Sequence, residues 1–163
     1  MSETGAPAGR AVRRVQDAAA ALGLAIHVRR FPEGTRTAPD AARAVGCEVG
    51  QIVKSLVFMA DDRAILALTS GANRADVGKL AALTGASAVR RATAEEAREA
   101  TGFAIGGTPP FGHPRPLTVL VDRDLLGYAE VWAAAGTPDA VFGISPEELL
   151  RASGGVPADL REG

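Results

Sequence analysis

Hydrophobic residues recur along this chain at two different spacings, which divide it into predicted helices and strands. A spacing of three to four residues, as at Val12, Val15, Ala19 and Leu22, predicts an amphipathic helix. Short apolar runs bounded by glycine, proline or acidic turns predict strands. The predicted helices cover 9–22, 38–45, 76–84, 93–100 and 145–152, and the predicted strands cover 25–31, 52–59, 64–69, 86–89, 117–122, 128–134 and 140–144.

Local signals mark the ends of several predicted helices. Thr37 is placed to cap the helix over 38–45, and Gly46 stands just past its end. The sequence Thr93-Ala94-Glu95-Glu96 is a capping box, and Ser145-Pro146-Glu147-Glu148 opens the last helix in a similar way.

Two of the strand pairs predict β-hairpins, one over 52–69 and the other over 128–144. Hairpins mixed with crossover helices predict an α+β (mixed α/β) fold and argue against a doubly wound sheet. A chain of 163 residues has the length of one domain. We therefore expect a single domain over 9–163, preceded by a disordered tail over 1–8.

Composition narrows the function classes. Apolar residues make up 47% of the chain and aromatic residues only 4%, so we expect a core of small residues. A formal net charge of −1 argues against a general DNA-binding protein. The single cysteine, Cys47, rules out an intramolecular disulfide, and no apolar run is long enough to span a membrane. Because the N-terminus has no charged-then-apolar leader, a cytoplasmic location is expected.

Familiar nucleotide, zinc and serine-hydrolase motifs are absent: there is no GxGxxG after a first strand, P-loop, CxxC pair, HExxH or GxSxG. A histidine-based triad would have to use His27 or His113. We interpret His27, Cys47 and Trp132 as structural residues, partly buried or in the core.

The segment Thr101–Pro114, TGFAIGGTPPFGHP, contains four glycines and three prolines, so it predicts neither a helix nor a central strand. Gly106 and Gly107 allow a ligand to approach the main chain, and the prolines stiffen the rest of the segment. A pair of N–H groups presented in this way would bind a carbonyl oxygen, a carboxylate or a phosphate. The alternative is a tight surface crossover without a ligand.

Lys54 interrupts the apolar strand IVKSLVFM. One interpretation is an edge-strand lysine whose ammonium reaches solvent. The other is an ammonium held over a cleft, where it stabilises developing negative charge or a phosphate.

The strand Ile52–Phe58, the loop from Thr101-Gly102 through Gly106–Gly112, Asp122 and Gly136 together resemble the YbaK/EbsC family. Its members are stand-alone relatives of the prolyl-tRNA synthetase editing domain, and the resemblance covers about 9–160. It implies a mixed sheet curled toward a barrel with flanking helices. It also implies hydrolysis of the ester that joins a wrong amino acid to the acceptor end of tRNA, without a metal or cofactor.

By position, Lys54 matches the family's functional lysine, and Gly106-Gly107 match the loop that holds the aminoacyl carbonyl or terminal ribose. These three are the expected catalytic residues. The expected substrate-binding residues are Phe31, Ser55, Ser70, Thr108, Phe111, His113 and Asp122. Because an aminoacyl ester is already activated, positioning and oxyanion stabilisation suffice, with water or a substrate group attacking.

The resemblance leaves the edited amino acid open. Members that remove alanine typically follow the lysine with asparagine, whereas Ser55 stands here. Members that remove cysteine usually differ at 108–111 and lack His113. The expected partner is an aminoacyl-tRNA acceptor end, together with a synthetase as a candidate, whereas DNA and membranes are not expected. The alternative function is a non-catalytic module that binds an acceptor end or an aminoacylated small molecule; a purely structural role is a third.

Overall fold

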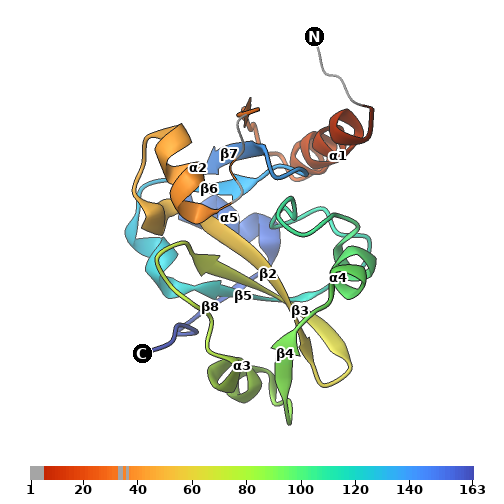
Figure 1. The fold of residues 1–163 in the computed structure, drawn as a ribbon, viewed down its shortest axis with the longest axis vertical. Helices are drawn as coiled ribbons and strands as arrows, with labels where there is room; N and C mark the ends of the chain where they lie inside the picture. The colour runs from red at the N-terminus through yellow and green to blue at the C-terminus, as the bar shows by residue number, and fades with distance from the viewer. Residues whose placement is uncertain (1–5, 33–34, 36) are drawn as a thin grey trace.

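The computed structural model describes residues 6–32, 35 and 37–163. Helices separate single strands and pairs of consecutive strands along the chain (Figure 1). The helices are α1 (Ala6–Ala21), α2 (Ala38–Val45), α3 (Val77–Thr84), α4 (Ala94–Thr101) and α5 (Pro146–Ser153), with 3-10 turns η1 (Val49–Gln51) and η2 (Arg123–Gly127). The strands are β1 (Val28–Arg30), β2 (Val53–Ala60), β3 (Arg63–Ser70), β4 (Val89–Arg91), β5 (Thr118–Asp122), β6 (Val131–Ala134), β7 (Ala140–Ile144) and β8 (Val156–Ala158).

The strands form two sheets, one of three strands in the order β1-β7-β6 and one of five in the order β4-β2-β3-β5-β8. The long hairpin β2–β3 is the centre of the larger sheet, and β5 and β8 join it in parallel. An isolated bridge between Ile52 and Trp132 connects the start of β2 to β6 in the smaller sheet. The α+β class predicted from the sequence is confirmed, but within the described residues the sheets stay open and do not close into a barrel.

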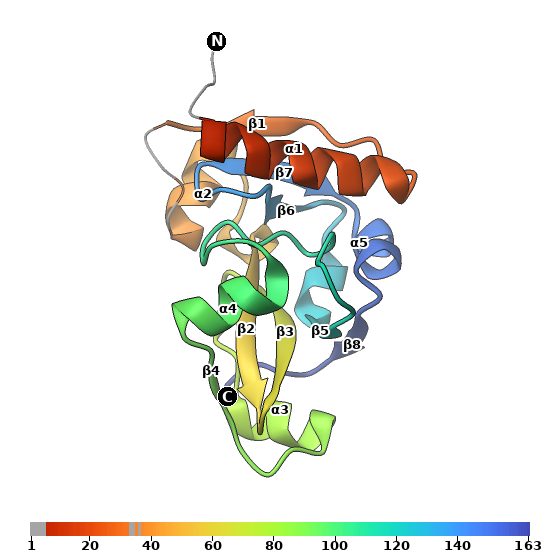
Figure 2. The same cartoon turned by 90° about the vertical axis from the view of Figure 1, so that its right-hand side faces the viewer.

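The main core lies where the smaller sheet, the odd-numbered side chains of β2 and the helices α1, α4 and α5 meet. Leu66 and Leu68 of β3 face this core, whereas Ile65 and Ala67 face a second cluster that α3 covers with Leu80. Because β3 is buried on both faces, its residues 64–68 form a continuous apolar run with no polar alternation. Helices α1 and α3 lie at opposite ends of the molecule, and α4 lies beside the β2–β3 hairpin (Figures 1 and 2).

The capping residues predicted for α2 and α4 are confirmed. The Thr37 and Thr93 side chains each accept the N–H three residues on, and Glu96 completes the capping box at α4. Gly46 and Gly102 end their helices in the left-handed conformation. These ends were predictable because each cap joins residues at most four positions apart.

Several boundaries differ from the prediction. The strand expected over 25–31 contains only Val28–Arg30, and His27 before it is exposed, not partly buried. The strand expected over 86–89 is shifted to Val89–Arg91, and the segment after Gly154 forms β8. Helix α1 begins at Ala6, inside the tail expected over 1–8, and residues 1–5 of that tail lie outside the described residues. In the part of the chain that the structure describes, no helix has the length and apolar character needed to cross a membrane.

Candidate active site

A cavity of about 430 Å³ lies where β2 faces the smaller sheet. Its walls come from the beginning of α2, Ile52 and residues 53–57 of β2, the loop after α4, and residues 132–134 on β6. Two features singled out from the sequence meet here, because Lys54 and Ser55 of β2 line the same cavity as Gly106 and Thr108 of the glycine-rich loop. Its volume falls within the usual range for small-molecule sites.

The cavity lies along an unpaired part of the β2 edge. Ala92 N–H donates to the Val57 carbonyl, whereas Gly71 N–H donates to the Ile52 carbonyl on the opposite edge. Main-chain groups alternate along a strand, so those of Ser55 point the same way as those of Val57. Strand β4 pairs with β2 only over 58–60. The Ser55 N–H and carbonyl therefore face the cavity side, where no paired strand continues.

Lys54 reaches from β2 to the turn after β3. Its Nζ donates to the Asn73 carbonyl oxygen at 2.5 Å, which leaves two ammonium hydrogens for other partners. Partial burial lowers the pKa of Lys54, the positive charges of Arg74 and Arg91 lower it further, and Asp122 acts in the opposite direction. The side chain is half-buried, and the Asn73 carbonyl holds its ammonium.

Ser55 contributes a polar group that lacks a partner in the protein. Its Oγ is buried, and among the described residues it makes no hydrogen bond. A buried hydroxyl without a partner is unfavourable by roughly 1–3 kcal/mol. Because Ser55 lines the cavity, a bound ligand is able to satisfy this group.

The two loop glycines differ in their surroundings. Gly106 lines the cavity with a positive φ of 88°, and its N–H has no main-chain partner within the described residues. Gly107 is buried: its N–H donates to the Ala104 carbonyl, and its own carbonyl accepts from Gly136 N–H. A Cβ at Gly107 would lie 2.6 Å from the Gly136 carbonyl oxygen. The expected pair of free N–H groups is therefore reduced to that of Gly106, while Gly107 joins the loop to the β6–β7 turn.

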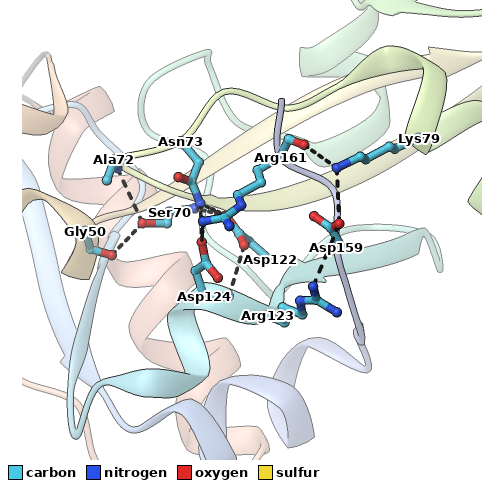
Figure 3. A network of polar contacts seen from close by, with 10 residues as sticks. All are labelled: Gly50, Ser70, Ala72, Asn73, Lys79, Asp122, Arg123, Asp124, Asp159 and Arg161. Carbon is cyan, nitrogen blue, oxygen red and sulfur yellow. Dashed lines mark hydrogen bonds and ion pairs between the residues drawn. The ribbon is translucent and has the colours of Figure 1, made fainter. Parts of the chain in front are cut away.

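Ser70 and Asp122 are buried and lie outside the cavity lining, in a polar network with Asn73 (Figure 3). Ser70 N–H and the Asn73 amide both donate to Asp122 Oδ2, at 3.0 and 2.9 Å. Asp124 N–H donates to the other Asp122 oxygen at 3.0 Å, and Ser70 Oγ donates to the Gly50 carbonyl at 2.7 Å. These residues hold the turn that accepts the Lys54 ammonium.

Three other expected binding residues do not line this cavity. Phe111 is in the main core with its ring 5.7 Å from that of Phe142. His113 Nε2 lies 2.9 Å from the Pro109 carbonyl oxygen, and burial lowers its pKa, which favours the neutral imidazole. Both line a separate hollow next to α1. Phe31 lies beside the smaller sheet, where the Arg29 guanidinium stacks on its ring at 5.1 Å.

Sequence reasoning missed several residues of the cavity region. Arg91 lines the cavity and stacks over Phe58 at 5.5 Å from the ring centre. Trp132, expected to be a core anchor, is half-buried and also lines the cavity. No sequence signal pointed to Arg91, because the strand predicted over 86–89 ended two positions before it, whereas the observed strand ends at Arg91. Cys47 is half-buried, and burial, Glu130 and Glu48 raise the pKa of its thiol, which disfavours the reactive thiolate.

Within the described ranges, no group of three or more histidine, cysteine, aspartate or glutamate residues is arranged to hold a metal ion.

Comparison with known proteins identifies the family. The aminoacyl-tRNA editing domain matches this chain over residues 32–152. The chain belongs to that family. Every residue that lines the cavity lies between 32 and 152, so the matched segment contains the whole candidate site.

Three relatives place this editing domain in different settings. A crystal structure provisionally described as a trans-editing enzyme for prolyl tRNA synthetase has a TM-score of 0.89 and 56% identity, covering 94% of this chain and 98% of that one. The proline–tRNA ligase of Geobacillus sp. (strain WCH70) is 33% identical over 129 residues, which are 78% of this chain but only 22% of the ligase. EbsC of Enterococcus faecalis (strain ATCC 700802 / V583), provisionally named a Cys-tRNA(Pro)/Cys-tRNA(Cys) deacylase, is 25% identical over 131 residues, 80% of each chain. The resemblance to the YbaK/EbsC family is thus confirmed.

Proposed function

We propose that this chain is a trans-editing hydrolase that cleaves the ester of mischarged aminoacyl-tRNA carrying a small amino acid. The observation that carries the proposal is the meeting of Lys54 and Gly106, 52 positions apart in sequence, at one cavity. An ammonium and a main-chain N–H at one site are suited to stabilise an oxyanion. The relatives named for prolyl-tRNA editing support tRNA-Pro as the carrier.

In the proposed reaction, the aminoacyl ester enters the cavity with its carbonyl oxygen toward Lys54 and Gly106. Water attacks the carbonyl carbon, and the negative charge that develops on the carbonyl oxygen is stabilised by the ammonium and the N–H. The carbon–oxygen bond to the terminal ribose then breaks, the ribose oxygen takes a proton, and the free amino acid leaves. Such a site needs no protein nucleophile, because the ester is already activated and the enzyme supplies position and charge.

The size of the cavity favours a substrate with a small amino acid and only a short part of the tRNA inside. Its volume of about 430 Å³ must hold the aminoacyl group and whatever part of the terminal nucleoside enters with it. The positive charges of Arg74 and Arg91 act on Lys54, and both arginines would pair with acceptor-end phosphates, with a phosphate replacing the Glu162 carboxylate that lies 3.8 Å from Arg74 Nε. The substrate would be met in the cytoplasm, and a synthetase would supply it.

A panel of mischarged tRNAs tests the proposal. tRNA-Pro charged in turn with alanine, serine, cysteine or a bulky residue is incubated with excess protein, and free amino acid is measured over time. We expect release of at least one small amino acid well above the uncatalysed rate. Binding without release, seen as protection of the ester, would instead identify a non-catalytic module.

A further inference from the structure

The Lys54 ammonium is held by a turn whose own position depends on a buried polar network. Lys54 Nζ donates to the main-chain carbonyl of Asn73 at 2.5 Å, and Asn73 N–H donates to the Ser70 carbonyl at 2.9 Å. A lysine side chain has a flexible four-carbon stem, so a single acceptor decides where its charge rests. The place of the Asn73 carbonyl therefore determines the place of the ammonium.

The Asn73 side chain ties this turn to two carboxylates. Its Nδ2 donates to Asp122 Oδ2 and to Asp124 Oδ2, both at 2.9 Å (Figure 3). Asp122 is 1% exposed, and its carboxylate accepts hydrogen bonds from Ser70 N–H, the Asn73 amide and Asp124 N–H. Asparagine suits this position because one amide carries two donors, whereas an aspartate would place a third carboxylate among the first two.

The C-terminal segment 159–162 lies against the other side of the turn. Glu162 N–H donates to the Arg74 carbonyl, so the segment pairs with the chain directly after Asn73. Arg161 Nη1 donates to Asp124 Oδ2 at 2.8 Å, the same oxygen that accepts the Asn73 amide. One polar network therefore connects Arg161, through Asp124 and Asn73, to the Lys54 ammonium.

We propose that Asn73 is the positioning residue for Lys54, and that Arg161 reinforces it through Asp124. The inference rests on the proposed function, since it assigns Asn73 a role in the same reaction. Asn73 acts without touching the ester: it sets the distance between the ammonium and the developing oxyanion. A displacement of about 1 Å at a reacting group is enough to lower a rate by roughly 100-fold.

Two variants and a matched control test this role. Asn73→Ala removes both side-chain donors but keeps the main-chain carbonyl, and Arg161→Ala removes an exposed side chain that contacts Asp124. Arg123→Ala is the control, because Arg123 pairs with Asp159 on the same segment at 3.8 Å and, within the described structure, its side chain bonds neither Asn73 nor Asp124. Single-turnover deacylation is measured on the ester that wild type releases fastest, over a range of protein concentrations.

Lysine NMR supplies a readout that does not depend on activity. The chain has two lysines, Lys54 and Lys79, so 13Cε-labelled lysine gives two sets of signals, and Lys54→Arg assigns them by loss. For Asn73→Ala we expect a roughly 10- to 100-fold lower rate at saturation, a half-saturating concentration like that of wild type, and a displaced Lys54 signal. Arg161→Ala should shift the same signal and lower the same rate by less, and Arg123→Ala should behave as wild type.

The outcomes separate this inference from the proposed function. If Asn73→Ala is folded by circular dichroism and keeps the wild-type Lys54 signal and rate, the inference is wrong. If Asn73→Ala unfolds, Arg161→Ala becomes the test. A Lys54 signal in Arg161→Ala that matches that of wild type would then overturn the inference. If the wild-type protein hydrolyses none of the esters, the proposed function fails. The Lys54 signal would still show whether Asn73 holds the ammonium.

Discussion

Lys54 is the charged group on which the proposed chemistry depends, so its removal is the most direct test. We expect Lys54→Ala to lower the single-turnover rate by roughly 10²–10³-fold, which is the usual effect of losing one oxyanion donor. The fold should persist, because the side chain is half-buried and makes a single hydrogen bond in the described structure. Circular dichroism is the control, and an unchanged rate would remove Lys54 from the mechanism.

The pKa of Lys54 adds a pH dependence to this prediction. In the proposed mechanism the ammonium form is the active one, so the catalysed rate should fall as pH rises through the pKa of Lys54. Burial, Arg74 and Arg91 lower that pKa, so the fall should be centred below the value of an ordinary lysine. Rates measured for Lys54→Ala at each pH give the background without the ammonium, and a limb that survives in this variant would belong to another group.

For Ser55 we expect that a substitution lowers activity without lowering stability. Ser55→Ala removes a buried hydroxyl that has no partner among the described residues, so the free energy of unfolding should stay level or rise by about 1 kcal/mol. Release of substrates that bond this hydroxyl should slow, as measured on the same panel of esters.

Ser70→Ala is the matched control for Ser55→Ala. The Ser70 hydroxyl donates to the Gly50 carbonyl at 2.7 Å, so its loss should destabilise the protein by about 1 kcal/mol or more. A Ser55→Ala protein that is less stable and deacylates all esters at the wild-type rate would contradict a ligand-facing role for this hydroxyl.

In the glycine-rich loop between α4 and β5, we expect substitutions at Gly106 and Gly107 to have different effects. Gly107→Ala would bring a Cβ to 2.6 Å from the Gly136 carbonyl oxygen, so we expect overpacking that destabilises the protein by about 1–3 kcal/mol. Gly106→Ala meets only Pro138 at 3.5 Å, so its effect on stability is the left-handed backbone strain of about 1–2 kcal/mol.

Activity should distinguish the two loop variants. Gly106→Ala adds a methyl group at the cavity wall and should slow ester release more than its stability loss explains, whereas folded Gly107→Ala should retain more activity. Urea unfolding and single-turnover rates on the same preparations make the comparison. The reverse ranking would show that Gly107, not Gly106, contacts the substrate.

The charge of the whole molecule limits how it would bind the proposed tRNA substrate. With a formal net charge of −1, the protein cannot bind a tRNA body through phosphates alone, so we expect contacts at the acceptor end only. Two phosphate contacts, one each from Arg74 and Arg91, predict a log–log slope of rate against salt concentration of about −1.4.

A salt series at subsaturating protein checks this slope, with a minihelix that carries only the acceptor stem as the comparison substrate. We expect the minihelix and the full tRNA to show the same slope. A slope several times steeper for full tRNA would reveal a broad basic surface.

The helices and the central hairpin could be predicted from the sequence because their signals are local. The Thr37 and Thr93 caps, the left-handed glycines and the hairpin β2–β3 each depend on residues that lie close together in the chain. The resemblance to a known family added the prediction that Lys54 and the glycine-rich loop belong to one site. Strand β8 was missed because three residues with two glycines before them form a strand only by pairing with β5.

The arrangement around the ammonium depends on contacts between distant residues, and no local pattern encodes them. Lys54 meets Asn73 across 19 positions, and Asn73 meets Asp122 across 49. Likewise, only packing against the Gly136 turn distinguishes buried Gly107 from cavity-lining Gly106, although the two are adjacent and chemically identical. Residue types, spacing and the resemblance therefore singled out Lys54 and the glycine-rich loop, whereas the folded chain determined what each of them faces, because burial and hydrogen-bond partners are set by segments that meet only after folding.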